Sequence, residues 1–419
     1  MSHAMMISLG LLVVCFLIRM PIAIGMIISS TLYLAVKGMD PSVVVEIFTS
    51  KMYNNFILLA VPLFIFAANI IFDFSKVLVG RWKGGLGHVN VIASLIFSGM
   101  TGSAVADASG LGIMEIEAMR KEGYDDGFSA AITAGSAVIG PIFPPSIPLV
   151  IYGVIAGASI GNLFLAGMVP GIILALALCI YVCYIANKRN YPSGRKYAGM
   201  EFIRMTVSAI PALLTPIILL MGIYTGIMTA TEAGAVAALY ALLISIFAYR
   251  SMTLPEFIQV LKNTVKSTGQ IGIMLGAAYV FSYVIAVENL PSLAGNLILS
   301  FATTKVTFLI FVNIILIILG MLLDSAVLQL VLLPILCPIA QSLGIDMVHF
   351  GVVFTLNTMI GLCTPPFGML LFIVTGISGE KMNTIIKEVM PMVLVMVLVL
   401  ILVTFVPDVI MWLPRLFGR

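Results

Sequence analysis

The chain has 419 residues, of which 61% are hydrophobic and 9% are charged, and its mean hydropathy is +1.18. A soluble domain carries about a quarter charged residues, so this composition excludes a soluble globular protein and predicts a polytopic membrane protein. The formal net charge is +3, which gives no reason to expect a nucleic-acid partner.

Apolar stretches long enough to span a bilayer recur along the whole chain. They cover residues 5–36, 55–72, 127–160, 161–186, 209–226, 228–249, 264–287, 349–378 and 389–414. The first stretch is too long for a signal peptide and lacks a cleavage pattern, so we expect it to be a first membrane helix. Two stretches that alternate polar and apolar residues, 40–54 and 253–263, are expected to be arms that lie along the membrane surface.

Two further apolar stretches, 89–118 and 306–343, are interrupted near their middles by small and polar residues. The interruptions fall at residues 98–107 and 320–325. We interpret each stretch as two half-helices joined by a tip, which forms a re-entrant hairpin that enters and leaves the membrane on the same side.

A proline-rich pattern occurs twice, and it is the most informative feature of the sequence. GPIFPPS at residues 140–146 is matched by GLCTPPF at residues 361–367, an offset of 221 (361 − 140). The same offset pairs Ser136 with Asn357 and Ser103 with Asp324. In lipid, such broken backbone survives only where protein or a water-filled cavity satisfies its amide and carbonyl groups. Paired broken helices at matched positions of two halves indicate the substrate and ion sites of a secondary transporter.

The distribution of basic residues predicts the topology. Residues 187–204 form the most basic loop, which the positive-inside rule places in the cytoplasm. Counting spans from there also places four further loops inside, namely 73–88, 119–126, 250–263 and 379–388. The first hairpin then opens inward and the second outward, so the repeat is inverted. The N-terminus is expected in the cytoplasm and the C-terminus in the periplasm.

The broken helices and hairpin tips offer the kinds of ligand that a dehydrated sodium ion needs. Such an ion takes about five or six oxygen ligands, which unwound carbonyls and Ser, Thr, Asn or Asp side chains can supply. Proline frees a further carbonyl one turn earlier. The candidate sodium ligands are Ser103, Ser136, Gly140, Pro141, Asp324, Asn357, Gly361, Cys363 and Thr364. The candidate substrate contacts are Thr101, Gly102, Ser146, Ser325, Thr358 and Pro366. The alternative is that the prolines only kink packed helices, but two matched kinks, each with a polar hairpin, favour a site.

The acidic residues in apolar surroundings have competing interpretations. Asp324 is a functional candidate by default, because a carboxylate at membrane depth is costly; the alternative is a structural cap of the returning half-helix. For Asp107, helix capping and an ion or substrate contact both stay open. Glu232 is expected to satisfy the start of its helix. Glu115 and Glu117 are expected to be solvated near the cytoplasmic end.

The chain resembles the large membrane subunit of tripartite ATP-independent periplasmic transporters in five stretches, in matching order. These are residues 98–107, 140–148, 230–235, 320–324 and 364–368. The resemblance implies an all-α, elevator-type fold in a bacterial inner membrane, driven by sodium and fed by a periplasmic substrate-binding protein. It also implies a small four-helix membrane subunit, which is expected to be a separate chain because no such extra helices appear here. The implied substrates are carboxylates such as dicarboxylates, sugar acids or sialic acid.

Combined with this resemblance, the repeat predicts a moving transport domain and a scaffold. The scaffold comprises residues 1–72 and 228–287, including both arms. The transport domain comprises residues 88–160 and 306–378, each a hairpin followed by a broken helix. Connecting helices are expected at 161–226 and a C-terminal helix at 389–419.

The predicted function is therefore sodium-coupled secondary active uptake of a carboxylate, with no organic cofactor. A stand-alone sodium–carboxylate symporter that needs no binding protein remains the main alternative. An enzyme is not expected: His3, His88 and His349 fall near predicted ends of spans, and intramembrane serine chemistry needs a base at membrane depth. Asp107 and Asp324 could meet as an aspartyl pair, but no other protease feature accompanies them. A channel is disfavoured because nothing repeats as a ring-forming pore helix.

Overall fold

A computed structural model describes residues 3–18, 20, 22–52, 72, 74–76, 78–194, 199–225, 227–248, 254–288, 304–321, 323–365 and 368–417. Within these residues the ordered elements are helices, and the only β-type pairing is an isolated bridge between Lys83 and Ser193. The predicted all-α fold is confirmed.

The first half and the connection after it contain α1 (His3–Leu17), α2 (Ile22–Val36), α3 (Ser42–Met52), α5 (Gly85–Thr101), α6 (Ala104–Lys121), α7 (Asp126–Ala137), α8 (Ile147–Ala156) and α9 (Ile160–Arg189). The rest contains α10 (Gly199–Tyr224), α11 (Ala230–Leu243) with the π-helical η2 (Ile244–Ala248), α12 (Leu254–Val287), α14 (Lys305–Gly320), α15 (Ser325–Ser342), α16 (Met347–Leu362), α17 (Met369–Ser378), α18 (Met382–Phe405) and α19 (Asp408–Phe417). Four helices in the described part of the chain, within α9, α10, α15 and α18, are long and apolar enough to cross a membrane.

The helix boundaries repeat with the offset found in the sequence. Helices α6 and α15 begin and end 221 residues apart (325 − 104 and 342 − 121), and α7 and α16 also begin 221 residues apart (347 − 126). The starts of α8 and α17 are 222 residues apart (369 − 147). Each half therefore contains a helical hairpin followed by a helix broken at the proline motif.

The two broken helices run in opposite directions. At the far end of the first one, the Tyr152 hydroxyl of α8 donates a 2.7 Å hydrogen bond to the Met347 carbonyl, where α16 begins. At the far end of the second one, the Ser378 carbonyl of α17 accepts a 2.7 Å hydrogen bond from Arg120, close to the start of α7. The end of each broken helix thus lies beside the start of the other.

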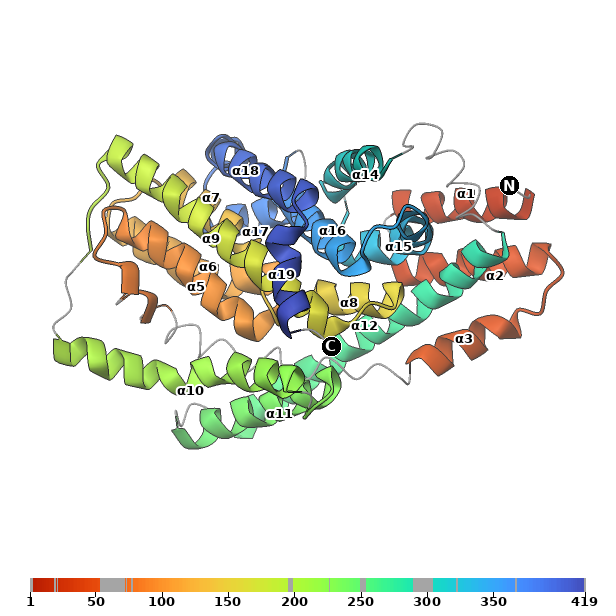
Figure 1. The fold of residues 1–419 in the computed structure, drawn as a ribbon, viewed down its shortest axis with the longest axis horizontal. Helices are drawn as coiled ribbons and strands as arrows, with labels where there is room; N and C mark the ends of the chain where they lie inside the picture. Colours follow the sequence, from red (N-terminus) through yellow and green to blue (C-terminus); the bar gives the residue numbers. More distant parts are fainter. Residues whose placement is uncertain are drawn as a thin grey trace.

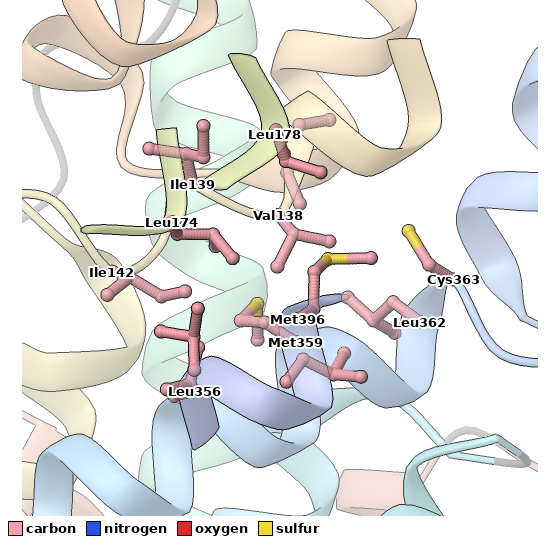
Figure 2. Packing of buried hydrophobic residues seen from close by; sticks show 14 of the residues in the cluster. Val138, Ile139, Ile142, Leu174, Leu178, Leu356, Met359, Leu362, Cys363 and Met396 are labelled. Atoms are coloured by element: carbon pink, nitrogen blue, oxygen red, sulfur yellow. The ribbon is translucent and has the colours of Figure 1, made fainter. Parts of the chain in front are cut away.

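The segment after each helix break packs against the hairpin and broken helix of the other half. Helix α8 packs on α15 and α16 of the other half, and α17 packs correspondingly on α6 and α7. Helix α9 packs on α16 and α18 packs on α7, so α9 and α18 belong to the same packed body as the hairpins. Figure 2 shows the centre of this core, where Val138, Ile139 and Ile142 of the first break meet side chains of α9, α16 and α18.

The N-terminal helices form a second cluster. Helices α1 and α2 pack together, and α12 packs on both α2 and α3 (Figure 1). Their buried core is joined to the hairpin body through Ile151 of α8 and Leu330 of α15. The Tyr33 hydroxyl of α2 and the ammonium of Lys37, just after α2, both lie 2.7 Å from the carboxylate of Glu288, which follows α12.

Four of the loops predicted to share one side of the membrane lie together at one end of the bundle. Arg189 makes two hydrogen bonds with Glu388, of 2.8 and 2.9 Å, and one of 3.0 Å with Asp125. The Pro192 carbonyl accepts a hydrogen bond from Gly84. These contacts join loops 73–88, 119–126, 187–204 and 379–388. Burial, together with the hydrogen bond to Asp125, raises the pKa of Tyr191 beside this cluster.

Three predicted boundaries are wrong. The C-terminal helix expected at 389–419 is divided, because α18 ends at Phe405 and α19 begins at Asp408, after Pro407. Residues 5–36 were expected to form one membrane helix, but α1 and α2 are separate and pack against each other, with the break before Pro21 in the sequence. Proline disfavours helix at the preceding residue, which accounts for the break. Residues 253–263 and 264–287 were expected as an arm and a span, but α12 runs continuously from Leu254, since Pro255 sits in its first turn, where proline is tolerated. The expected arm at 40–54 is helical as α3, and the expected span at 55–72 lies almost wholly outside the described residues.

We predict that Gly361→Ala destabilises the fold. A Cβ at position 361 would lie 2.6 Å from the carbonyl carbon of Gly320, where α14 and α16 touch backbone to backbone. Overpacking of this kind costs about 1–3 kcal/mol, so the midpoint of thermal unfolding in detergent should fall by several degrees. Gly376→Ala is the control, because nothing lies within 4 Å of a Cβ there. An equal midpoint for the two variants would contradict the close backbone contact.

Candidate functional site

A cavity of about 250 Å³ lies where the two hairpin tips meet the two broken helices. The first half contributes residues 102–105 of its tip and Pro141, Ile147, Pro148 and Ile151 of its broken helix. The second half contributes residues 324–326 of its tip and Leu330, Met359 and Leu362. Five of the predicted site residues therefore line one cavity: Gly102, Ser103, Pro141, Asp324 and Ser325.

The tip of the first hairpin is held against the first break. Gly102 ends α5 in the left-handed conformation (φ 57°), and Ser103 caps α6 by accepting a 3.3 Å hydrogen bond from the Ala106 amide. The Ile147 amide at the start of α8 donates to the Gly102 carbonyl at 3.4 Å. Ser146 caps α8, and its hydroxyl also bonds to the Pro141 carbonyl within the break. Each freed backbone group named here is satisfied by another part of the same unit.

The second tip repeats this arrangement with a carboxylate in place of a hydroxyl. Asp324 caps α15 and accepts a 2.8 Å hydrogen bond from the Ala326 amide. The Gly368 amide at the start of α17 donates to the Met321 carbonyl at 3.2 Å. The structural interpretation of Asp324 is confirmed, because it caps the returning half-helix; it also lines the cavity, and its functional role stays a prediction.

Three helices begin at the cavity wall, and their N-termini set its electrostatics. Residues from the first turns of α6, α8 and α15 all belong to the lining. A helix N-terminus carries a partial positive charge and favours an anion. The carboxylate of Asp324 lies among these N-termini, so groups of opposite charge line the same cavity.

Other predicted ligands lie behind the cavity, where their side chains join helices. Ser136 Oγ lies 2.7 Å from Asn90 Oδ1 and 3.1 Å from Ser94 Oγ on α5. In the other half, the Asn357 amide donates to the carbonyl and the side-chain oxygen of Asn313, at 3.0 and 2.6 Å. The matched pair Ser136 and Asn357 therefore holds each broken helix to the first arm of its hairpin.

The remaining candidates are also buried. Thr358 pairs with Ser325 at 2.9 Å. Thr364 donates to the Ile360 carbonyl, and the Cys363 thiol donates to the Ala134 carbonyl of the other half. Gly140 lies against the Ser103 backbone, Gly361 lies against Gly320, and the Thr101 hydroxyl is buried with no hydrogen-bond partner among the described residues. Pro366 lies outside the described residues.

The structure tests the capping and exposure expected of three acidic residues outside the cavity. Glu232 forms a capping box with Thr229, which confirms the expectation. Asp107 does not cap α6, because Ser103 does so and Asp107 lies one turn further on. The expectation that Glu115 is solvated is wrong, since it is 1% exposed. Position 115 continues the buried stripe of α6 at helical spacing, whereas Glu117 lies on the exposed face and pairs with Lys121.

Sequence reasoning missed the polar partners on the first arms of the hairpins and the apolar part of the lining. Asn90, Ser94 and Asn313 stand in apolar runs and hold the broken helices. Their amide and hydroxyl groups at membrane depth were a signal that could have identified them. Met359 and Leu362 also line the cavity, and their apolar side chains gave no signal of their own beside the polar candidates Asn357, Thr358 and Thr364.

Two oppositely directed broken-helix units around one cavity in a hydrophobic helical chain define a membrane transporter of the secondary type. Comparison with known proteins specifies the family. The chain belongs to the family described as "Tripartite ATP-independent periplasmic transporter, DctM component", which matches residues 9–409.

Named relatives agree with this assignment, and a solved structure shares the fold. The chain is 42% identical over 373 residues to the sialic acid TRAP transporter large permease protein SiaM of Vibrio cholerae serotype O1, covering 87% of each chain. It is 38% identical over 427 residues to the sialic acid TRAP transporter permease protein SiaT of Haemophilus influenzae, covering 99% of this chain and 69% of that one. The fold is similar to the Alcanivorax borkumensis YdaH transporter, with a TM-score of 0.65 at 12% identity over 86% of each chain.

We predict that Gly102→Ala disturbs the first tip. The substitution would force an alanine into the left-handed region and place its Cβ 2.6 Å from the Pro145 carbonyl oxygen. Strain at such a position costs of order 1–3 kcal/mol, so the tip should separate from the break and transport should fall at least about tenfold. Gly110→Ala on α6 is the control, with nothing within 4 Å of its Cβ. Uptake measured in cells at matched expression would contradict the prediction if both variants equalled the wild type.

Proposed function

We propose that this chain is the sodium-coupled membrane permease of a tripartite uptake system for a small organic acid. The observation that carries the proposal is the shared cavity, in which three helix N-termini and the Asp324 carboxylate converge. The helix N-termini suit the carboxylate of a substrate. A bound sodium ion would balance Asp324, which would otherwise repel that substrate.

The sodium ligands proposed are those predicted from the repeat. Ser103, Pro141 and Asp324 line the cavity and could reach an ion directly. The other proposed ligands lie in or beside the two helix breaks, where carbonyl groups freed by proline are further candidates. They are Ser136, Gly140, Asn357, Gly361, Cys363 and Thr364. The substrate would contact Gly102 and Ser325, which line the cavity. The other proposed substrate contacts are Thr101, Ser146, Thr358 and Pro366, which adjoin the cavity-lining residues in sequence or in contact.

The substrate class and partners are proposed from the family and from the names of the relatives. Both relatives described above are named for sialic acid, which is a carboxylic acid. A tripartite system implies two partners: a periplasmic substrate-binding protein that delivers the substrate, and a small membrane subunit as a separate chain. The absence of an arginine within either hairpin tip leaves backbone dipoles and hydroxyl groups to bind the anion.

The proposed mechanism is an elevator movement in a bacterial inner membrane, with the N-terminus cytoplasmic and the C-terminus periplasmic. The moving body would contain the hairpins and broken helices, and the packing favours including α9 and α18, which contact them closely. The scaffold would contain α1 to α3 and α12, which share a core of their own, together with α11, which packs on α10. The hairpins would then be re-entrant, entering from opposite sides.

The first test is uptake of labelled sialic acid into proteoliposomes under an inward sodium gradient. We expect uptake only with sodium, the small subunit and the binding protein together, because the gradient supplies the energy and the binding protein supplies the substrate. Dissipating the gradient with a sodium ionophore is the control. Sodium-driven uptake by this chain alone would instead support the stand-alone symporter.

A second test separates the charge of Asp324 from its capping role. Asparagine caps helices as well as aspartate does, so the Asp324→Asn variant should fold normally. The sodium concentration that gives half-maximal uptake should rise at least about tenfold. Asp346→Asn is the matched control, because Asp346 caps α16 in the same way and does not line the cavity. If Asp324→Ala and Ser103→Ala both left the sodium dependence unchanged, the ion-site assignment would be wrong.

A further inference from the structure

Two carboxylic acids lie buried on one face of α6, away from the cavity. Asp107 and Glu115 are each 1% exposed. Ser94 of α5 interacts with the Asp107 carboxyl group, but none of the four carboxyl oxygens has a hydrogen bond of good geometry among the described residues. A buried polar group without a partner is rare in a native protein and needs an explanation. The function proposed above uses neither residue.

The two acids face a polar interface between α5, α6 and α7. Asn90 and Ser94 of α5 bond to Thr133 and Ser136 of α7. Helix α7 approaches α6 closely between the two acids, where a Cβ on Gly112 would lie 2.8 Å from the Thr133 methyl group. The hydrogen-bonding capacity of this interface is used mainly between α5 and α7, so the carboxyl groups of α6 gain little from it.

Within the described part of the chain, no basic side chain on α6 or on the helices packed against it is placed to neutralise the pair. Helix α6 packs on α5, α7 and α17. On α5 the only titratable side chain is His88, which contacts Cys183 of α9, and on α7 it is Asp126, which pairs with Arg120. Helix α17 has no titratable side chain. At the far end of α6, Lys121 pairs with the exposed Glu117.

A shared metal ion cannot account for both carboxyl groups. Residues eight positions apart on a helix are separated by about 12 Å along its axis, which is more than two carboxyl groups can span around a single ion. An ionised carboxylate buried alone would cost several kcal/mol. A carboxyl group that binds its own proton avoids this cost and needs no further ligand.

We propose that Asp107 and Glu115 form a proton-binding site inside the α5–α6–α7 bundle. Each carboxylate takes up one proton from water and becomes a neutral carboxylic acid when the bundle is packed. The matching positions of the second half, 221 residues on, are Leu328 and Leu336, so the site belongs to the first half alone. Opening this bundle exposes the acids to water, where they release their protons.

The site makes the first hairpin sensitive to pH. The packed bundle holds protons that an opened bundle releases. The stability of the packed bundle is therefore greatest at acid pH, and it falls as the pH rises above the range where exposed carboxyl groups ionise. The bundle carries the tip at Gly102 and Ser103, so protonation is linked to the cavity wall. The inference does not depend on the proposed function, and its test requires no transport.

The experiment compares thermal unfolding at acid and alkaline pH for the full chain in detergent. The wild-type midpoint should fall by at least about 5 °C more than that of the double variant Asp107→Asn, Glu115→Gln, whose amide side chains cannot ionise. Glu117→Gln is the matched control on the same helix and should follow the wild type, because Glu117 is exposed. Equal pH dependence in the wild type and the double variant would overturn the proposal.

A second measurement keeps the proposal testable if the double variant fails to fold. Infrared spectroscopy of the wild-type protein at neutral pH should show the carbonyl band of a protonated carboxylic acid. The band should be weaker in each single variant and unchanged in Glu117→Gln. Its absence from the wild type would show that both acids are ionised and would also overturn the proposal.

Discussion

The constraint on which the rest of the structure depends is the satisfaction of backbone groups at the two helix breaks. A break inside an apolar bundle frees amides and carbonyls that lipid cannot satisfy. Here the hairpin tips satisfy them: the Ile147 amide bonds to Gly102, and the Gly368 amide bonds to Met321. Ser103, Ser146 and Asp324 cap the helices that begin there. Each hairpin and its broken helix therefore form one unit that neither part could maintain alone.

This mutual satisfaction also creates the cavity. Since each tip must reach its own break, and the two broken helices run in opposite directions, both tips arrive at the middle of the bundle. Helices that begin there point their N-termini inward and supply partial positive charge without any basic side chain. Asp324 adds a full negative charge in the same place. Positive helix N-termini and a full negative charge therefore share one small cavity, so the charge of any bound ligand must be compatible with both.

The sequence allowed much of this to be predicted, because the decisive signals are local. Prolines and small polar residues within apolar runs placed both breaks and both tips, and the offset between Ser103 and Asp324 matched the two halves before any helix was located. What could not be predicted depends on tertiary packing. The burial of Glu115 follows from which face of α6 meets α5 and α7. The roles of Asn90 and Asn313 follow from which helix lies opposite them.

The two halves of the inverted repeat differ in the charged side chains at matched positions. Matched positions hold serine in one tip and aspartate in the other, so the negative charge in the cavity comes from the second half only. The buried acids come from the first half only, where the second has leucine. A backbone repeat with equivalent side chains would bind the same species on both sides of the cavity. Because the charges differ while both tips line one cavity, the two halves present different chemistry to the same ligand.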